Sequence, residues 1–119
     1  MVMKFLQRGR RSLKQPEINY RFSPDARADY FSILDYISNT LINPDAADAF
    51  SDELQKSIKL AQSFPEMHPV EMKIKYEYRK MVVGNYLVFY VVLEKEIVIV
   101  RILNNRQNFK YILKRSQSL

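Results

Sequence analysis

The side chains of this chain that could do chemistry are cations and phenols, and they gather in its second half. They lie in or beside apolar, strand-like runs, at Lys73, Lys75, Tyr76, Tyr78, Arg79, Lys80, Arg101, Arg106, Lys110 and Tyr111. An arginine fork matches the oxygens of a phosphate, and aromatic faces stack on bases, so this set is typical of a surface that binds a nucleic acid strand. The alternative is an exposed basic strand edge whose long side chains snorkel to water.

Arg101 differs from the rest of this set because it lies inside the apolar run IVIVRIL. A guanidinium in such a place must find a carboxylate, backbone carbonyls or a ligand, since an unpaired buried charge is costly. We expect a structural ion pair. The alternative is that Arg101 forms the floor of an anion-binding groove.

Several kinds of site are excluded by composition. The chain has one histidine, His68, and no cysteine, which rules out paired-histidine catalysis, thiolate chemistry and multi-histidine or sulfur metal sites. We interpret His68 as a surface residue. The two glycines, Gly9 and Gly84, are too few for a glycine-rich phosphate loop. The sequence therefore predicts no metal and no cofactor.

The charge of the chain favours an anionic partner. Nineteen Lys and Arg against thirteen Asp and Glu give a net charge of +6, which suits nucleic acid, an acidic protein or an anionic membrane surface. Residues 1–15 form a basic arm that either is disordered or binds nucleic acid, and residues 16–119 are expected to form one domain. With no signal peptide and no apolar stretch of about 20 residues, we expect a cytoplasmic protein without a membrane segment.

The first half of the domain is predicted to be a strand and two helices. Residues 18–22 alternate apolar and polar side chains, and Pro16 before them suits an edge strand. Ser23 followed by Pro24 starts a helix whose apolar positions recur every three or four residues up to Leu41. Asn43 and a second proline start another helix, which ends near residue 64, so the two form an antiparallel hairpin.

The second half is predicted to be a loop at 66–75, then strands at 78–83, 86–93 and 97–103. A Gly-Asn turn joins the first two strands, which makes them adjacent and antiparallel. The sequence thus predicts an α+β fold in which an N-terminal strand and a three-stranded antiparallel meander form a four-stranded sheet, with a short C-terminal helical tail. The last two strands are apolar on both faces, so the face that the hairpin leaves open needs the C-terminal segment or a partner as its cover.

Residues 17–113 resemble the RelE/ParE superfamily of bacterial toxins from type II toxin-antitoxin systems. The resemblance depends on INYRFSPDARADYFSILDYI, on VGNYLVFYVV and on IVIVRILNNRQNFKYIL, in this order and spacing. It implies a small basic protein with a helical hairpin on an antiparallel sheet. It also implies that a cognate acidic antitoxin wraps around the toxin and holds it inactive.

Some members of the superfamily cleave mRNA on the ribosome, and others poison DNA gyrase. For the cleaving kind, the resemblance implies catalytic roles for Arg79, Arg106 and Tyr111. The basic residues expected to bind the nucleic acid are Lys73, Lys75, Arg101 and Lys110. One departure is that many cleaving members read Tyr-Arg early in the central strand, where this chain has Tyr86 and Leu87.

Three functions follow from this resemblance. The first is a ribosome-dependent mRNA endoribonuclease that inhibits translation, which we take as the main hypothesis. The second is a toxin that binds DNA gyrase without catalysis. The third is a toxin that has lost its activity and survives as an antitoxin-binding module.

Overall fold

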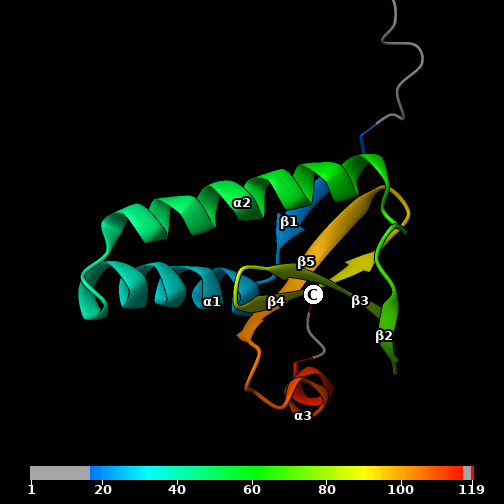
Figure 1. Ribbon diagram of the computed structural model, residues 1–119. Helices are drawn as coiled ribbons and strands as arrows, with labels where there is room; N and C mark the ends of the chain where they lie inside the picture. The colour runs from blue at the N-terminus through cyan, green and yellow to red at the C-terminus, as the bar shows by residue number, and fades with distance from the viewer. Residues whose placement is uncertain (1–16, 117–118) are drawn as a thin grey trace, which may run out of the picture.

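The computed structural model describes residues 17–116 and 119, which form a helical hairpin, a five-stranded sheet and a short C-terminal helix (Figure 1). In chain order the elements are β1 (Asn19–Phe22), α1 (Pro24–Asp35), the π-helix η2 (Tyr36–Thr40), α2 (Pro44–Ser63), β2 (Val70–Lys73), β3 (Glu77–Val83), β4 (Tyr86–Val92), β5 (Glu96–Asn104) and α3 (Phe109–Arg115). The predicted basic arm, residues 1–15, lies outside the described residues.

The two helices begin where the sequence predicts, because both start signals are used. The hydroxyl of Ser23 and the side-chain oxygen of Asn43 each accept a hydrogen bond from a free amide in the first turn of the following helix. The apolar stripe of α2 is buried as expected. The first helix differs, because its regular part ends at Asp35 and continues as the π-helix η2. The hairpin then turns through Ile42, whose φ is +52°.

The sheet corrects the predicted topology in two respects. Its strand order is β1-β5-β4-β3-β2, so it has five strands and not four. It is also mixed and not wholly antiparallel, because β1 pairs parallel with β5 in the register Asn19↔Glu96 to Phe22↔Ile99. The helical hairpin connects β1, at one edge of the sheet, to β2, at the opposite edge. Which strands pair after such a long connection is decided by tertiary packing.

The fifth strand, β2, lies in the segment that was predicted to be a loop. It pairs antiparallel with β3 at the edge of the sheet, with a register shift between Val70 and Met72. β2 has four residues, pairs with β3 alone, and its first and last residues are exposed. Its sequence therefore shows no alternation of apolar and polar side chains that would predict a strand.

Apolar side chains fill a core on each face of the sheet. The hairpin covers one face, above residues such as Met81, Val88 and Ile97. On the other face, α3 covers a second core made by Tyr78, Phe89, Val91, Val100, Leu103 and Leu113. Figure 1 shows α3 on the side of the sheet away from the hairpin. The C-terminal segment, and not a partner, is thus the cover of the second face.

A bulge in β5 redirects its side chains. Phe89 pairs with Arg101 and Tyr90 pairs with Ile99, which leaves Val100 without a partner across the strand pair. Before the bulge, Ile99 faces the hairpin, and after it Ile102 does so. The bulge therefore turns the side chains of both Val100 and Arg101 away from the core beneath the hairpin.

Candidate functional site

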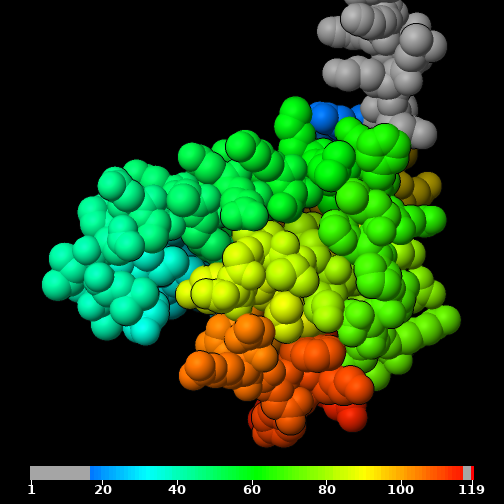
Figure 2. Space-filling model, in the orientation of Figure 1, coloured from blue at the N-terminus to red at the C-terminus, as the bar shows by residue number. Residues whose placement is uncertain are grey.

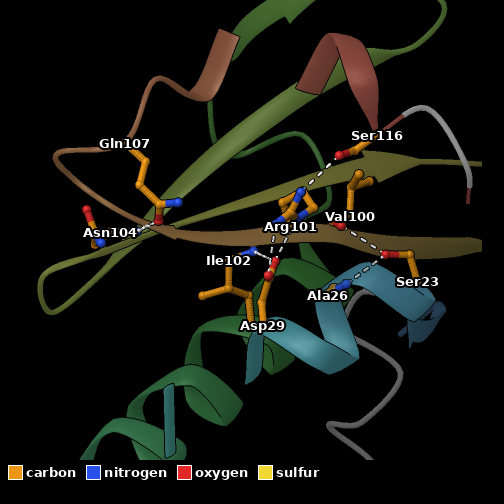
Figure 3. Close-up of polar contacts among 9 residues, drawn as sticks. All are labelled: Ser23, Ala26, Asp29, Val100, Arg101, Ile102, Asn104, Gln107 and Ser116. Atoms are coloured by element: carbon orange, nitrogen blue, oxygen red, sulfur yellow. Dashed lines mark hydrogen bonds and ion pairs between the residues drawn. The ribbon is translucent and has the colours of Figure 1, made fainter. Parts of the chain in front are cut away.

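Arg101 forms the predicted structural ion pair, and its partner is Asp29 of α1. Its Nε lies 2.7 Å from Asp29 Oδ2 and its Nη2 lies 2.9 Å from Oδ1, so the contact is bidentate (Figure 3). Nη1 donates to the hydroxyl of Ser116 at the end of α3, 2.9 Å away. All three guanidinium nitrogens therefore donate hydrogen bonds within the protein. These bonds connect α1, β5 and the end of α3.

Hydrogen bonds between side chains and the main chain of β5 surround this ion pair. Asp29 Oδ2 also accepts from the backbone N–H of Ile102 at 2.9 Å. Ser23 donates to the carbonyl of Val100, the bulge residue, and so fixes the start of α1 to β5. The pKa of Arg101 lies above its ordinary value, chiefly because Asp29 accepts its hydrogen bonds.

Sequence analysis missed Asp29, although a signal was present. Asp29 is three residues after Ala26 and four before Ile33, so it shares the core-facing side of α1 with them. A carboxylate in an apolar stripe needs a cation, and Arg101 needed a carboxylate. The two could have been matched on these grounds.

Arg79 holds a loop of the protein itself. Its Nη1 donates to the backbone carbonyls of Glu66 at 3.2 Å and His68 at 2.6 Å. Tyr90 holds the same loop, since its hydroxyl donates to the carbonyl of Pro65 at 2.8 Å. Burial raises the pKa of the Tyr90 phenol above its ordinary value, while the nearby Arg79 charge opposes that rise.

The structure does not bring Arg79 together with Tyr111. Successive side chains of a strand point to opposite faces. Tyr78 lies in the core beneath α3, so its neighbour Arg79 faces the hairpin side of the sheet. Tyr111 is on α3, where its side chain is 58% exposed. The sheet therefore separates these two predicted catalytic residues.

The other predicted lysines lie at the surface, Lys73 and Lys75 beside the β2–β3 turn and Lys110 on α3. Lys73 pairs with Glu77 at 3.4 Å, and Lys75 lies over the ring of Tyr76. Lys110 is exposed on α3. Arg115 lies 5.6 Å from the centre of the Tyr111 ring.

Arg106 lies beyond the end of β5, in an exposed turn. Its backbone N–H donates to the side-chain oxygen of Asn104 at 2.9 Å. Within the described part of the chain, its guanidinium makes no hydrogen bond or ion pair. Of the three predicted catalytic residues, Arg106 is the one that lines a large cavity.

That cavity is a groove of about 720 Å³ between the hairpin and the end of β5, here called the hairpin groove. Figure 2 shows an indentation between the hairpin and the segment that follows β5. Its lining residues are Asp29, Ser32, Ile33, Tyr36, Leu41, Asn85, Tyr86, Ile102, Asn104, Asn105, Arg106 and Gln107. One wall is thus helical and largely apolar, and the other is rich in amides.

Electrostatics in the hairpin groove are mild. Burial, and then the neighbouring phenol of Tyr36, raise the pKa of Tyr86 above its ordinary value, so this phenol is neutral near pH 7. Asp29 is neutralised by Arg101. Arg106 is the one cation in the lining, and it has no counterion among residues 17–116 and 119.

Two other features are absent from residues 17–116 and 119. These residues hold no group of three or more acidic or histidine side chains that could bind a metal ion. None of the helices they form has both the length and the hydropathy needed to cross a membrane.

Comparison with known proteins identifies the family. The profile of the family described as "ParE toxin of type II toxin-antitoxin system, parDE" matches residues 20–109. A solved structure described as "Chromosomal ParDE TA system from P. aeruginosa" is similar, with a TM-score of 0.61 at 21% identity. The match covers 74% of this chain and 96% of that one. No curated protein sequence matches the chain.

The family match confirms the predicted resemblance to the RelE/ParE superfamily. It spans most of the described residues, from β1 to the start of α3, so it covers the hairpin groove and both cores except for the residues that α3 adds to the second core. The chain belongs to the family of ParE toxins of type II toxin-antitoxin systems.

Proposed function

We propose that this ParE toxin acts by binding DNA gyrase and not by cleaving RNA. This was the alternative to our main hypothesis from the sequence, and the family match favours it. The observation that carries the proposal is that the residues expected to act together on a phosphate do not converge. Arg79 and Arg101 are bonded inside the protein, and Tyr111 lies on the opposite face from Arg79.

Cleavage of RNA makes demands that this arrangement does not meet. A base must deprotonate the 2′ hydroxyl, cations must stabilise the charge that develops on the phosphate, and an acid must protonate the leaving oxygen. These groups have to lie within hydrogen-bonding reach of one phosphate. Leu87, at the position where many cleaving members have arginine, packs against the core beneath α3 and adds no charge.

We also propose an acidic antitoxin as the partner of this toxin. The net charge of +6 favours such a protein, and toxins of this family belong to toxin-antitoxin pairs. The second face of the sheet gives no support for a partner, because α3 covers that face.

The proposal is tested by expressing the protein without its antitoxin, with mapping of DNA breaks and RNA ends in the same cells. We expect growth arrest with DNA breaks, and inhibition of supercoiling when purified toxin is added to gyrase. Ribosome-dependent RNA ends that vanish in Tyr111→Phe would show instead that the protein is an RNase, because this change keeps the ring and removes only the hydroxyl. Normal growth would favour the third hypothesis, a toxin without activity.

A further inference from the structure

We propose that the hairpin groove is the surface that grips the target protein. The segment it fits has an apolar ridge flanked by carboxylates or other hydrogen-bond acceptors. This inference rests on the proposed function, since it names the contact through which a binding toxin would act. Four features of the groove support it: its apolar wall, the irregular backbone of that wall, its donor-rich wall and its neutral floor.

The helical wall presents large apolar side chains to water. Tyr36 is 49% exposed and Leu41 is 54% exposed, and Ile42 beside them is 81% exposed. Figure 1 shows this closed end of the hairpin projecting beyond the sheet. Single exposed apolar residues are ordinary, but a contiguous group next to a groove is typical of a protein-protein contact.

The backbone of this wall departs from regular geometry at the same residues. Tyr36–Thr40 form a π-helix, and Ile42 has a φ of +52°. A β-branched residue in the left-handed region is strained, and the strain is not offset by burial of its side chain. π-helical turns and strained residues of this kind cluster at functional sites.

The opposite wall offers hydrogen-bond donors. The side-chain oxygen of Gln107 accepts from the backbone N–H of Asn104 at 2.9 Å (Figure 3). The side-chain oxygen of Asn104 accepts from the backbone N–H of Arg106, also at 2.9 Å. Since both oxygens already accept a hydrogen bond, the NH2 groups of these two lining residues remain as donors. The guanidinium of Arg106 adds a charged donor with no counterion in the described residues. Acceptors such as carboxylates fit this wall.

The floor does not repel an acidic partner. Asp29 is the one carboxylate in the lining. Both of its oxygens already accept hydrogen bonds, from Arg101 and from the backbone of Ile102. Its charge is therefore compensated inside the protein.

A protein segment fits the hairpin groove better than a nucleic acid does. Phosphate backbones are bound by several cations along a track, and this groove supplies only Arg106. The cations of α3 belong to a helix that covers the other face of the sheet. The apolar wall of Tyr36, Ile33 and Leu41 matches side chains and not phosphates.

The test compares two groove variants with two matched controls, all as full-length protein. Arg106→Glu reverses the charge of the lining cation, and Tyr36→Ser removes the largest side chain of the apolar wall. Lys56→Glu makes the same charge change on α2, and Val82→Ser removes an apolar side chain that is 63% exposed on β3. The probe is purified DNA gyrase holoenzyme, measured by inhibition of supercoiling and by direct binding. Thermal unfolding checks that each variant is folded.

We expect each groove variant to weaken inhibition and binding by about tenfold or more, as loss of a central contact does. The controls should stay within about twofold of the parent. Groove variants that inhibit as well as the parent would overturn the inference while leaving the proposed function intact. If the parent itself does not inhibit gyrase, the proposed function fails.

Two further outcomes would assign the groove to another partner. The cognate antitoxin should bind the groove variants as tightly as it binds the parent. If the groove variants lose antitoxin binding and still inhibit gyrase, the groove is the antitoxin-binding site and the inference is overturned. Salt-dependent binding of the groove to duplex DNA alone, lost in Arg106→Glu and kept in Tyr36→Ser, would likewise overturn it in favour of a nucleic acid ligand.

Discussion

At the residue scale, the three predicted arginines divide into two that hold the fold together and one whose guanidinium has no partner in the described part of the chain. Arg101 donates hydrogen bonds to Asp29 and Ser116, and Arg79 donates to carbonyls of the loop before β2. The guanidinium of Arg106 makes no such hydrogen bond in the described residues, and it lines the hairpin groove. The residue type was the same in each case, and the surroundings decided the role.

Replacing Arg101 should destabilise the protein strongly. Arg101→Ala leaves Asp29, whose side chain is only 15% exposed, without its cation. Breaking a buried pair by removing one partner costs about 3 kcal/mol. Urea unfolding measures the change. The double variant with Asp29→Ala should recover part of the loss, and Arg106→Ala, an exposed control, should stay within about 0.5 kcal/mol of the parent.

His68 should make stability depend on pH. Burial lowers its pKa below the ordinary value of 6.5, and its ring packs edge-on against Tyr90. Below pH 6.5 the unfolded chain therefore binds more protons than the folded protein, so the free energy of unfolding falls as pH falls through this range. His68→Gln should remove this component. NMR titration of the ring checks the pKa directly, and a value at or above 6.5 would contradict the prediction.

At the element scale, α3 is a structural cover and not an appendage. It closes the core on the second face, where Phe109 stacks on Phe89 with ring centres 5.0 Å apart. Leu113 on the same helix is fully buried. The bulge in β5 serves this arrangement, because it turns Val100 toward α3 and lets Arg101 reach Ser116. The helix, the bulge and the ion pair thus form one unit.

Truncating Leu113 should test the importance of α3. Leu113→Ala leaves a cavity in the core of the second face, and such changes cost about 3 kcal/mol. Tyr111→Ala on the exposed side of the same helix should change stability by less than about 0.5 kcal/mol. Chemical denaturation compares the two. Equal effects would mean that α3 does not pack on the sheet in solution.

At the scale of the whole molecule, two cores and one sheet account for the fold of residues 17–116 and 119. Every strand from β1 to β5 is paired, and each face of the sheet has its cover. The excess of positive charge lies almost entirely in residues 1–14, which hold five of the 19 Lys and Arg and none of the 13 Asp and Glu. The folded body is therefore close to neutral, and the hairpin groove lies at one end of it.

Deleting residues 1–14 should leave this body intact. The described residues close both cores without them, so we expect the free energy of unfolding to change by less than about 0.5 kcal/mol. Thermal unfolding with and without the arm is the measurement. Loss of cooperative unfolding in the shorter protein would show that the arm belongs to the core.

The sequence by itself determined the features that depend on neighbouring residues. Ser23 and Asn43 start helices because a side chain caps amides two or three positions away. Gly84 makes the β3–β4 turn because its φ of +59° is open to glycine. The run around Arg101 indicated that a partner was needed, and the order of the motifs indicated the family.

The tertiary structure decided what depends on distant residues. The parallel pairing of β1 with β5, the edge strand β2 and the choice of Asp29 as the partner of Arg101 join segments far apart in the chain. No local pattern encodes which strand edge or which carboxylate will be nearest after packing. For the same reason the sequence could name the cations of the site, but could not show that, of Arg79, Arg101 and Arg106, it is the guanidinium of Arg106 that has no partner in the described residues.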